Sequence, residues 1–430
     1  MTLRPTEPAV GGDRDVPTPD PFARDYLLLA LRLDQRIPGL VDGYFGPAAL
    51  KAQVETEQLP APAVLVDGAT DLAARLATEI ADPARREWLR VQLIALETHA
   101  RALAGAPLPY LEHIGRCFDA APVRRPEAVF RAATDELAEL VPGSASLAVR
   151  LADWDARLVV PVDRLKGVVD WLVGVVRERS VAAFGAPAGD SLRVSLVTGQ
   201  PWSGYNWYDG GLRSRVDINT DLPVRASDLI ELVAHETYPG HHLEHAWREA
   251  LRVGERAELE ASVLLINTPE CFISEGLAVV GARSAVPADV EPAVLAELLD
   301  RAGLTDRAGG DPAAVGSTVE RMIRIRVARG SLSAAATNAA LMLHVDGMDR
   351  AMVGRWLEQV AAMAPDRVAK RLEFLEHPLW RTYVFVYSEG AVLLDRWLAM
   401  VAPEDRAGRF RRLLVEPVTP SGIAAELGSG

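Results

Sequence analysis

The segment "HETYPGHHLEH", residues 235–245, holds four of the eight histidines of this 430-residue chain. Histidines clustered beside glutamates are typical of a metal site. The preceding residues, "SDLIELVAHE" (227–236), have apolar side chains spaced as on the buried face of a helix, which we expect to begin at Asp228. That helix then meets Pro239 and Gly240, and the path of the chain through them decides where the histidines lie.

Pro239 interrupts a helix because it has no N–H and its ring clashes with the carbonyl four residues back, that of His235. On a straight helix His241 would lie about 120° around the axis and about 9 Å along it from His235. Two nitrogens that are each about 2.1 Å from one zinc ion must be much closer. A bulge at Pro239 and Gly240 would return His241 to the face of His235. His242 is the alternative second ligand, and otherwise a hydrogen-bonding neighbour of the site.

With such a bulge, the segment follows the order of the HExxH zinc peptidases, a histidine ligand followed directly by a glutamate general base. Glu236 is then the base. A second arrangement stays open, because "HHLEH" (241–245) is itself an HxxEH segment. In that arrangement His241 and His245 bind the metal and Glu244 is the base.

A third ligand is predicted at Glu275, in the apolar stretch "CFISEGLAVV" (271–280). Thr268 and Pro269 have the residue types of a helix N-cap and first position, so Glu275 lies well inside a helix. A buried carboxylate needs a partner, and Zn²⁺ supplies one. The sequence therefore predicts one zinc ion per chain.

Three further residues are candidates for contact with a substrate. Tyr387 lies one helical turn after Tyr383, and its phenol could donate a hydrogen bond to the oxyanion of a tetrahedral intermediate. Arg215 and Asn219 lie on a predicted hairpin before the metal helix, whose edge strand could bind an extended peptide. We expect these two side chains to reach toward that peptide.

The rest of the chain predicts a mainly α-helical protein with two lobes. We expect a disordered N-terminal tail over residues 1–21, a helical N-terminal lobe over 22–190, and a catalytic lobe over 191–430. A small β-sheet is expected at about 191–223, where apolar and polar residues alternate, directly before the active-site helix.

Composition excludes several classes of partner. The net charge is −13, and no basic stripe interleaved with aromatic residues is present, so nucleic acid is not expected. The two cysteines form no CxxC pattern, which suits a reducing compartment and argues against a thiolate zinc site. No signal peptide and no membrane-spanning segment are expected. These features predict a cytoplasmic protein that does not bind membranes.

Three motifs in this chain resemble a bacterial family designated domain of unknown function 885: "HETYPGHH" (235–242), "EGLA" (275–278) and "YSEG" (387–390). That family looks like a distant member of the gluzincins, zinc peptidases that take two histidines from one helix and a glutamate from a later one. Dipeptidyl-peptidase III is similar in having an expanded HExxGH segment. The resemblance implies a gluzincin architecture with His235, His241 and Glu275 as ligands and Glu236 as the base, and it singles out Tyr387.

Residues and resemblance together predict a zinc metallopeptidase, a hydrolase that cleaves short peptides with a zinc-activated water and Glu236 as general base. Two alternatives remain open. One is a metal-dependent amidase or esterase that uses the same site on a small non-peptide metabolite. The other is a non-catalytic helical protein that only binds a metal.

Overall fold

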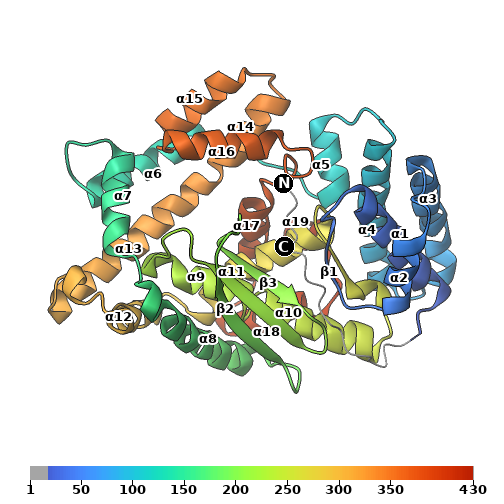
Figure 1. Cartoon of the computed structure of the whole chain (residues 1–430), viewed down its shortest axis with the longest axis horizontal. Coiled ribbons are helices and arrows are strands. Elements are labelled where there is room, and N and C mark those ends of the chain that lie inside the picture. The colour runs from blue at the N-terminus through green and yellow to red at the C-terminus, as the bar shows by residue number, and fades with distance from the viewer. Residues whose placement is uncertain (1–17, 430) are drawn as a thin grey trace.

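The computed structural model describes residues 18–429 of the chain, and these are mainly α-helical, as the sequence predicts (Figure 1). The helices of the first part are α1 (Pro21–Arg36), α2 (Ala48–Thr56), α3 (Pro62–Glu79), α4 (Pro83–Leu103), α5 (Tyr110–Phe118), α6 (Glu127–Leu140), α7 (Leu147–Arg157) and α8 (Val162–Phe184). Around the histidine segment lie α9 (Ala226–Glu236), α10 (His241–Trp247), a π-helix (Arg248–Glu255) and α11 (Pro269–Ala285). The remaining helices are α12 (Glu291–Arg301), α13 (Pro312–Ser333), α14 (Ala335–His344), α15 (Arg350–Val360), α16 (Pro365–Glu376), α17 (Val386–Leu398), α18 (Arg406–Val415) and α19 (Pro420–Gly428).

A small sheet precedes the histidine segment, as predicted. Its strands are β2 (Ser191–Val197), β3 (Gly204–Tyr208) and β4 (Arg213–Asn219), in the order β2-β4-β3. β3 pairs with β4 as an antiparallel hairpin, whereas β2 runs parallel to β4. A second pairing, which no sequence pattern indicated, places β1 (Val41–Tyr44) antiparallel to β5 (Val263–Leu265). This pairing joins the N-terminal helices to the segment that leads into α11.

Helices from residues 22–190 and from residues 191–430 are interleaved around the centre of the molecule. In Figure 1, α1 to α5 lie together on the right, whereas α6 and α7 lie on the left beside α13. α6 packs on both α13 and α15. Apolar side chains from both ranges join in one continuous core. The central position is taken by α11 and α17, which pack closely on each other.

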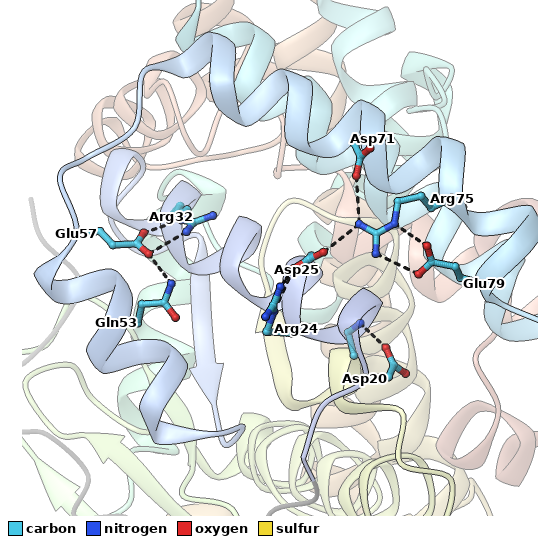
Figure 2. A network of polar contacts seen from close by, with 10 residues as sticks. Asp20, Arg24, Asp25, Arg32, Gln53, Glu57, Asp71, Arg75 and Glu79 are labelled. Carbon is cyan, nitrogen blue, oxygen red and sulfur yellow. Dashed lines mark hydrogen bonds and ion pairs between the residues drawn. The ribbon is translucent and has the colours of Figure 1, made fainter.

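The N-terminal helices are tied together by a charge network on their outer side (Figure 2). The Arg75 guanidinium on α3 bonds to Asp25, Asp71 and Glu79. Arg32 on α1 forms a bidentate pair with Glu57 just after α2. These groups are partly exposed, so each pair contributes at most about 1 kcal/mol. The network orients helices that the apolar core already holds.

The predicted disordered tail, residues 1–21, falls largely on residues 1–17, which lie outside the described part. Its last residues belong to the fold. Asp20 accepts a hydrogen bond from the Ala23 N–H at 2.7 Å, and Pro21 is the first residue of α1. An N-cap carboxylate followed by proline is a favoured start for a helix, so the boundary lies before Asp20.

Two glycines allow α11 and α17 to approach each other. A Cβ atom on Gly276 would lie 2.7 Å from the Gly390 carbonyl carbon, and one on Gly390 would lie 2.8 Å from the Phe272 carbonyl oxygen. Real Cβ atoms do not approach other atoms this closely. These are the glycines of the "EGLA" and "YSEG" segments. Their contact brings the tyrosines that precede Gly390 next to Glu275, which precedes Gly276.

Gly390→Ala therefore tests the helix contact. We expect the free energy of unfolding to fall by about 1–3 kcal/mol, because the added methyl group forces α17 away from α11. Thermal unfolding followed by circular dichroism measures the change. Gly174→Ala is the matched control: Gly174 is an exposed residue inside α8, and its added methyl group would have nothing within 4 Å, so that variant should gain about 0.5–1 kcal/mol. Equal melting temperatures for both variants would contradict this account.

Candidate metal centre

The histidine segment contains a complete break between two helices. α9 starts at Ala226, two residues earlier than predicted, and ends at Glu236; α10 starts at His241. Between them, the Gly240 N–H donates to the Ala234 carbonyl at 3.0 Å, a span of six residues where a helix spans four. The expected bulge is thus a tight turn that restarts the helix. Its effect is the predicted one, because His241 returns to the side of His235.

Glycine is required at position 240. A Cβ atom there would lie 2.0 Å from the His235 carbonyl oxygen and 2.5 Å from that of Ala234. Pro239 is held from the other side by α11, where a Cβ atom on Gly281 would lie 3.0 Å from the proline Cγ. The turn is therefore closed against the end of α9 and packed against α11, which fixes where α10 begins.

Three ligand atoms converge beside this turn. The His235 and His241 Nε2 atoms are 3.1 Å apart, and Glu275 Oε2 lies 3.3 Å and 3.9 Å from them, respectively. Ligands at about 2.0–2.1 Å from a tetrahedral zinc ion are separated by about 3.3–3.4 Å. Glu275 Oε2 is buried and has no hydrogen-bond donor within the described residues. Two imidazole nitrogens and an orphaned carboxylate oxygen at these separations fit one metal ion.

Neighbouring side chains orient the ligands. The Ser274 hydroxyl donates to Glu244 Oε2 at 2.5 Å and lies 3.2 Å from His241 Nδ1. Because its proton goes to Glu244, Ser274 can accept the Nδ1–H of His241, and this tautomer leaves the Nε2 lone pair free for a metal. On the other side, Tyr383 donates its phenol proton to Glu275 Oε1 at 2.8 Å. That bond turns Oε2 toward the histidines.

The electrostatics of the cluster favour a cation. Burial alone lowers the pKa of His241, but the Glu244 carboxylate 3.9 Å from its Nδ1 and the charges of Glu275 and Glu236 outweigh burial and raise the pKa to about 9. Burial raises the pKa of Glu275, yet its contacts with His235 and His241 and the Tyr383 bond leave that pKa below its usual value. The carboxylates of Glu236, Glu244 and Glu275 therefore favour positive charge at the three ligand atoms.

Glu236 is the last residue of α9 and is 7% exposed. Its side chain lies against β3, where a Cβ atom on Gly204 would come within 3.4 Å of Glu236 Cγ. The Asn206 amide of the same strand donates to the Glu236 carbonyl at 2.7 Å. No donor within residues 18–429 bonds to its carboxylate, and burial raises its pKa despite the nearby His235 and His241. Such a carboxylate suits a proton-accepting role.

The remaining histidines of the segment lie elsewhere. His242 is fully buried, with Nδ1 2.8 Å from Ser214 Oγ and Nε2 3.5 Å from Asp190 Oδ2, so it points away from Glu275 and anchors the turn. His245 has a ligand atom close to His241 and Glu244, as the inverted arrangement requires. In that arrangement Glu244 would be the base. Its two oxygens are already engaged by Ser274 and Arg248, which favours the first arrangement.

The tyrosines differ from each other in exposure. Tyr383 is buried and bonded to Glu275, whereas Tyr387 is 45% exposed, with its ring centroid 6.4 Å from that of His235. Tyr387 is thus positioned beside the ligands on a side open to solvent. Sequence spacing indicated both tyrosines, but it did not show that Tyr383 orients the carboxylate.

The two residues predicted to bind substrate lie on β4. The Asn219 amide donates to the carbonyls of Gln200 and Trp202, and the side chain is 3% exposed, so it holds the preceding loop. Arg215 pairs with Asp217 at 3.2 Å and lies over the Trp207 ring. Neither side chain is directed to the three ligand atoms by a contact in the described residues.

A second histidine group is present between α4 and α5. His99, His113 and Cys117 are buried and have ligand atoms within 4.8 Å of one another. Here the His99 Nε2 lies 3.0 Å from the Asn267 carbonyl, and the Arg381 guanidinium is 3.4 Å from His113 Nδ1. This group contains no carboxylate, and a positively charged arginine lies beside it. Both features disfavour a divalent cation, so the cluster of His235, His241 and Glu275 is the candidate metal centre.

No protein-family model and no curated protein matches the chain. Among solved structures, it is similar to a "putative lipoprotein" from Colwellia psychrerythraea, with 15% identity and a TM-score of 0.47 over 85% of this chain and 67% of that one. A "putative lipoprotein of unknown function" from Shewanella oneidensis is similar with 11% identity and a TM-score of 0.46 over 88% and 75% of the two chains. These likenesses are too distant to assign an activity. None of the described helices is both long and apolar enough to cross a membrane.

Ser274→Ala tests the orientation of the ligands. We expect metal affinity to fall about 10- to 100-fold, because His241 loses the partner of its Nδ1–H. Competition with a fluorescent chelator measures the affinity. The control is Ser284→Ala on the same helix, since the Ser284 hydroxyl bonds only to the Val280 carbonyl in the described structure. Unchanged affinity in Ser274→Ala would show that Ser274 does not position His241.

Proposed function

We propose that this protein is a zinc-dependent hydrolase, a metallopeptidase that cleaves short peptides. His235, His241 and Glu275 would hold one Zn²⁺ per chain through two Nε2 atoms and Oε2. The observation that supports this most directly is the orphaned buried oxygen of Glu275 beside two imidazole nitrogens, at separations that suit tetrahedral coordination. The 3.3 Å contact of this oxygen with His235 Nε2 is the contact that a shared metal ion would replace.

When bound, zinc with three protein ligands supplies an activated water and polarises the scissile carbonyl. Glu236 accepts the proton of the attacking water and passes it to the leaving amine nitrogen as the C–N bond breaks. Its burial and raised pKa suit this exchange. Tyr387 beside His235 can donate its phenol hydrogen bond to the oxyanion.

The position of β3 supports a peptide substrate. It forms an edge of the three-stranded sheet and carries Gly204, against which the Glu236 side chain lies. An edge strand offers backbone N–H and C=O groups to an extended peptide. Gly204 has no side chain, and Leu232 and Glu236 occupy that space, so the strand lies directly against the base.

Metal analysis of purified variants tests the site. The parent is expected to bind one equivalent of zinc; His235→Ala, His241→Ala and Glu275→Ala lose it, while His245→Ala, the control, retains it. Circular dichroism establishes equal folding. Loss in His245→Ala with retention in His235→Ala would instead assign the inverted HxxEH arrangement.

Glu236→Gln tests the chemistry on the same protein. We expect this variant to bind zinc like the parent but to cleave a short-peptide library at least about 100-fold more slowly, because the proton acceptor is lost. Cleavage of small amides or esters without cleavage of any peptide would favour the alternative hydrolase. Inactivity of the zinc-loaded parent toward all of these substrates would favour a non-catalytic metal-binding protein.

A further inference from the structure

One partly buried arginine on α16 has no acidic partner among the described residues. The buried face of α16 is formed by Val368, Leu372 and Leu375. Arg371 flanks this face, and the side chain three residues later, Phe374, lies on the same side of the helix. The guanidinium carbon of Arg371 is 6.0 Å from the centre of the Phe374 ring. The side of α16 that carries Phe374 therefore also carries the charge.

A chain of ring contacts, the aromatic wall, leads from Phe374 to the candidate metal centre; Tyr383 within it is buried, whereas Phe374, Trp380 and Tyr387 are partly exposed. Successive ring centroids are 5.9 Å apart for Phe374 and Trp380, 5.5 Å for Trp380 and Tyr383, and 5.6 Å for Tyr383 and Tyr387. Tyr387 is in turn 6.4 Å from His235. Arg371 also lies close enough to Tyr387 for the phenol to influence its pKa. The arginine and the metal ligand thus lie along the same wall.

Within residues 18–429, the Arg371 guanidinium forms no ion pair or hydrogen bond, whereas Arg350 of the neighbouring α15 pairs with Glu376 at 3.0 Å. Burial, and then the positive charge of Arg367, lower the pKa of Arg371. A partly buried charge without a partner is costly. The guanidinium is therefore prepared to receive an anion from outside the chain.

We propose that Arg371 is a subsite for a carboxylate of the substrate, so that the preferred substrates are short peptides with a free C-terminal carboxylate. This inference rests on the proposed peptidase function. Guanidinium groups bind carboxylates through two parallel hydrogen bonds, a geometry that suits a chain terminus. The carboxylates of Glu236 and Glu275 would offset the charge of a bound zinc ion, so Arg371 offers a substrate carboxylate a positive charge at the other end of the aromatic wall.

In this arrangement the C-terminal carboxylate belongs to the leaving segment. Water adds to the scissile carbonyl carbon, the C–N bond breaks, and the new amine of the leaving segment takes the proton carried by Glu236. The new carboxylate stays on the other product. An aspartate or glutamate side chain of the substrate could supply the same carboxylate chemistry, and the experiment separates the two sources.

The test compares one peptide in three forms: free acid, C-terminal amide, and amide with glutamate as its last residue. For the zinc-loaded parent, we expect kcat/KM for the free acid to exceed that for the amide at least about tenfold, mainly through KM. Arg371→Gln should remove this difference, because only kcat/KM for the free acid falls. The control is Arg367→Gln, because Arg367 is an exposed neighbour on the same helix. This variant should keep the preference for the free acid. Rescue of the amide by the terminal glutamate would assign the preference to an acidic side chain rather than to the chain terminus.

A binding measurement keeps this inference separate from the peptidase proposal. Calorimetry with zinc-loaded Glu236→Gln gives the Kd of each peptide without turnover, and the double variant Glu236→Gln/Arg371→Gln gives the contribution of the arginine. Tighter binding of the free acid that disappears in the double variant supports the subsite even if no peptide is cleaved. Equal Kd values for acid and amide, or equal kcat/KM values in a parent that does cleave peptides, would overturn it.

Discussion

The candidate metal centre depends on the contact between Gly240 and the carbonyl of His235. The two are so close that no side chain fits between them, and the Gly240 N–H meanwhile bonds to the Ala234 carbonyl. This closure removes the separation that six helical residues would impose. The two Nε2 atoms consequently face each other at 3.1 Å.

The turn is further anchored by Tyr238, whose hydroxyl bonds to Asp190, and by His242. Of the two adjacent histidines, His242 thus holds the turn, while His241 is left beside His235 as a candidate metal ligand.

A second constraint supplies the carboxylate ligand. The glycine contact between α11 and α17 lets the Tyr383 hydroxyl bond to one oxygen of Glu275. The other carboxylate oxygen has no donor in the described structure.

Behind His241, Glu244 is held by Arg248, which also pairs with Glu270. Burial lowers the pKa of this arginine to about 10, so the guanidinium stays charged at neutral pH. The charges behind His241 thus stabilise one another, whereas the Glu275 oxygen that faces the histidines is left for a cation.

Sequence patterns predicted the helical class, the small sheet and the helix that starts at Thr268 and Pro269, because each depends on local periodicity or on capping residues. The meeting of His235 with His241 was also predictable, since proline and glycine impose a local break. Tyr383 could not be assigned its contact, because the two tyrosines are equivalent in spacing and differ only in what packs against α17. The same limit applies to Asn219, whose polar side chain turned out to hold a loop. Long-range packing, which has no local pattern, decided these cases.

The charges at the two ends of the aromatic wall differ. Beside His235, the carboxylates of Glu236 and Glu275 would offset the charge of a bound divalent cation, while at the other end Arg371 lacks a counterion among the described residues. If Arg371 is the subsite that we propose, a peptide along the wall would be oriented by its terminal charge. Trp380 and Tyr387, which are not fully buried, would supply apolar contact that tolerates many side chains, since packing on these rings needs no specific hydrogen bond. Selection by chain end with little selection by side chain is the behaviour that this distribution of charge favours.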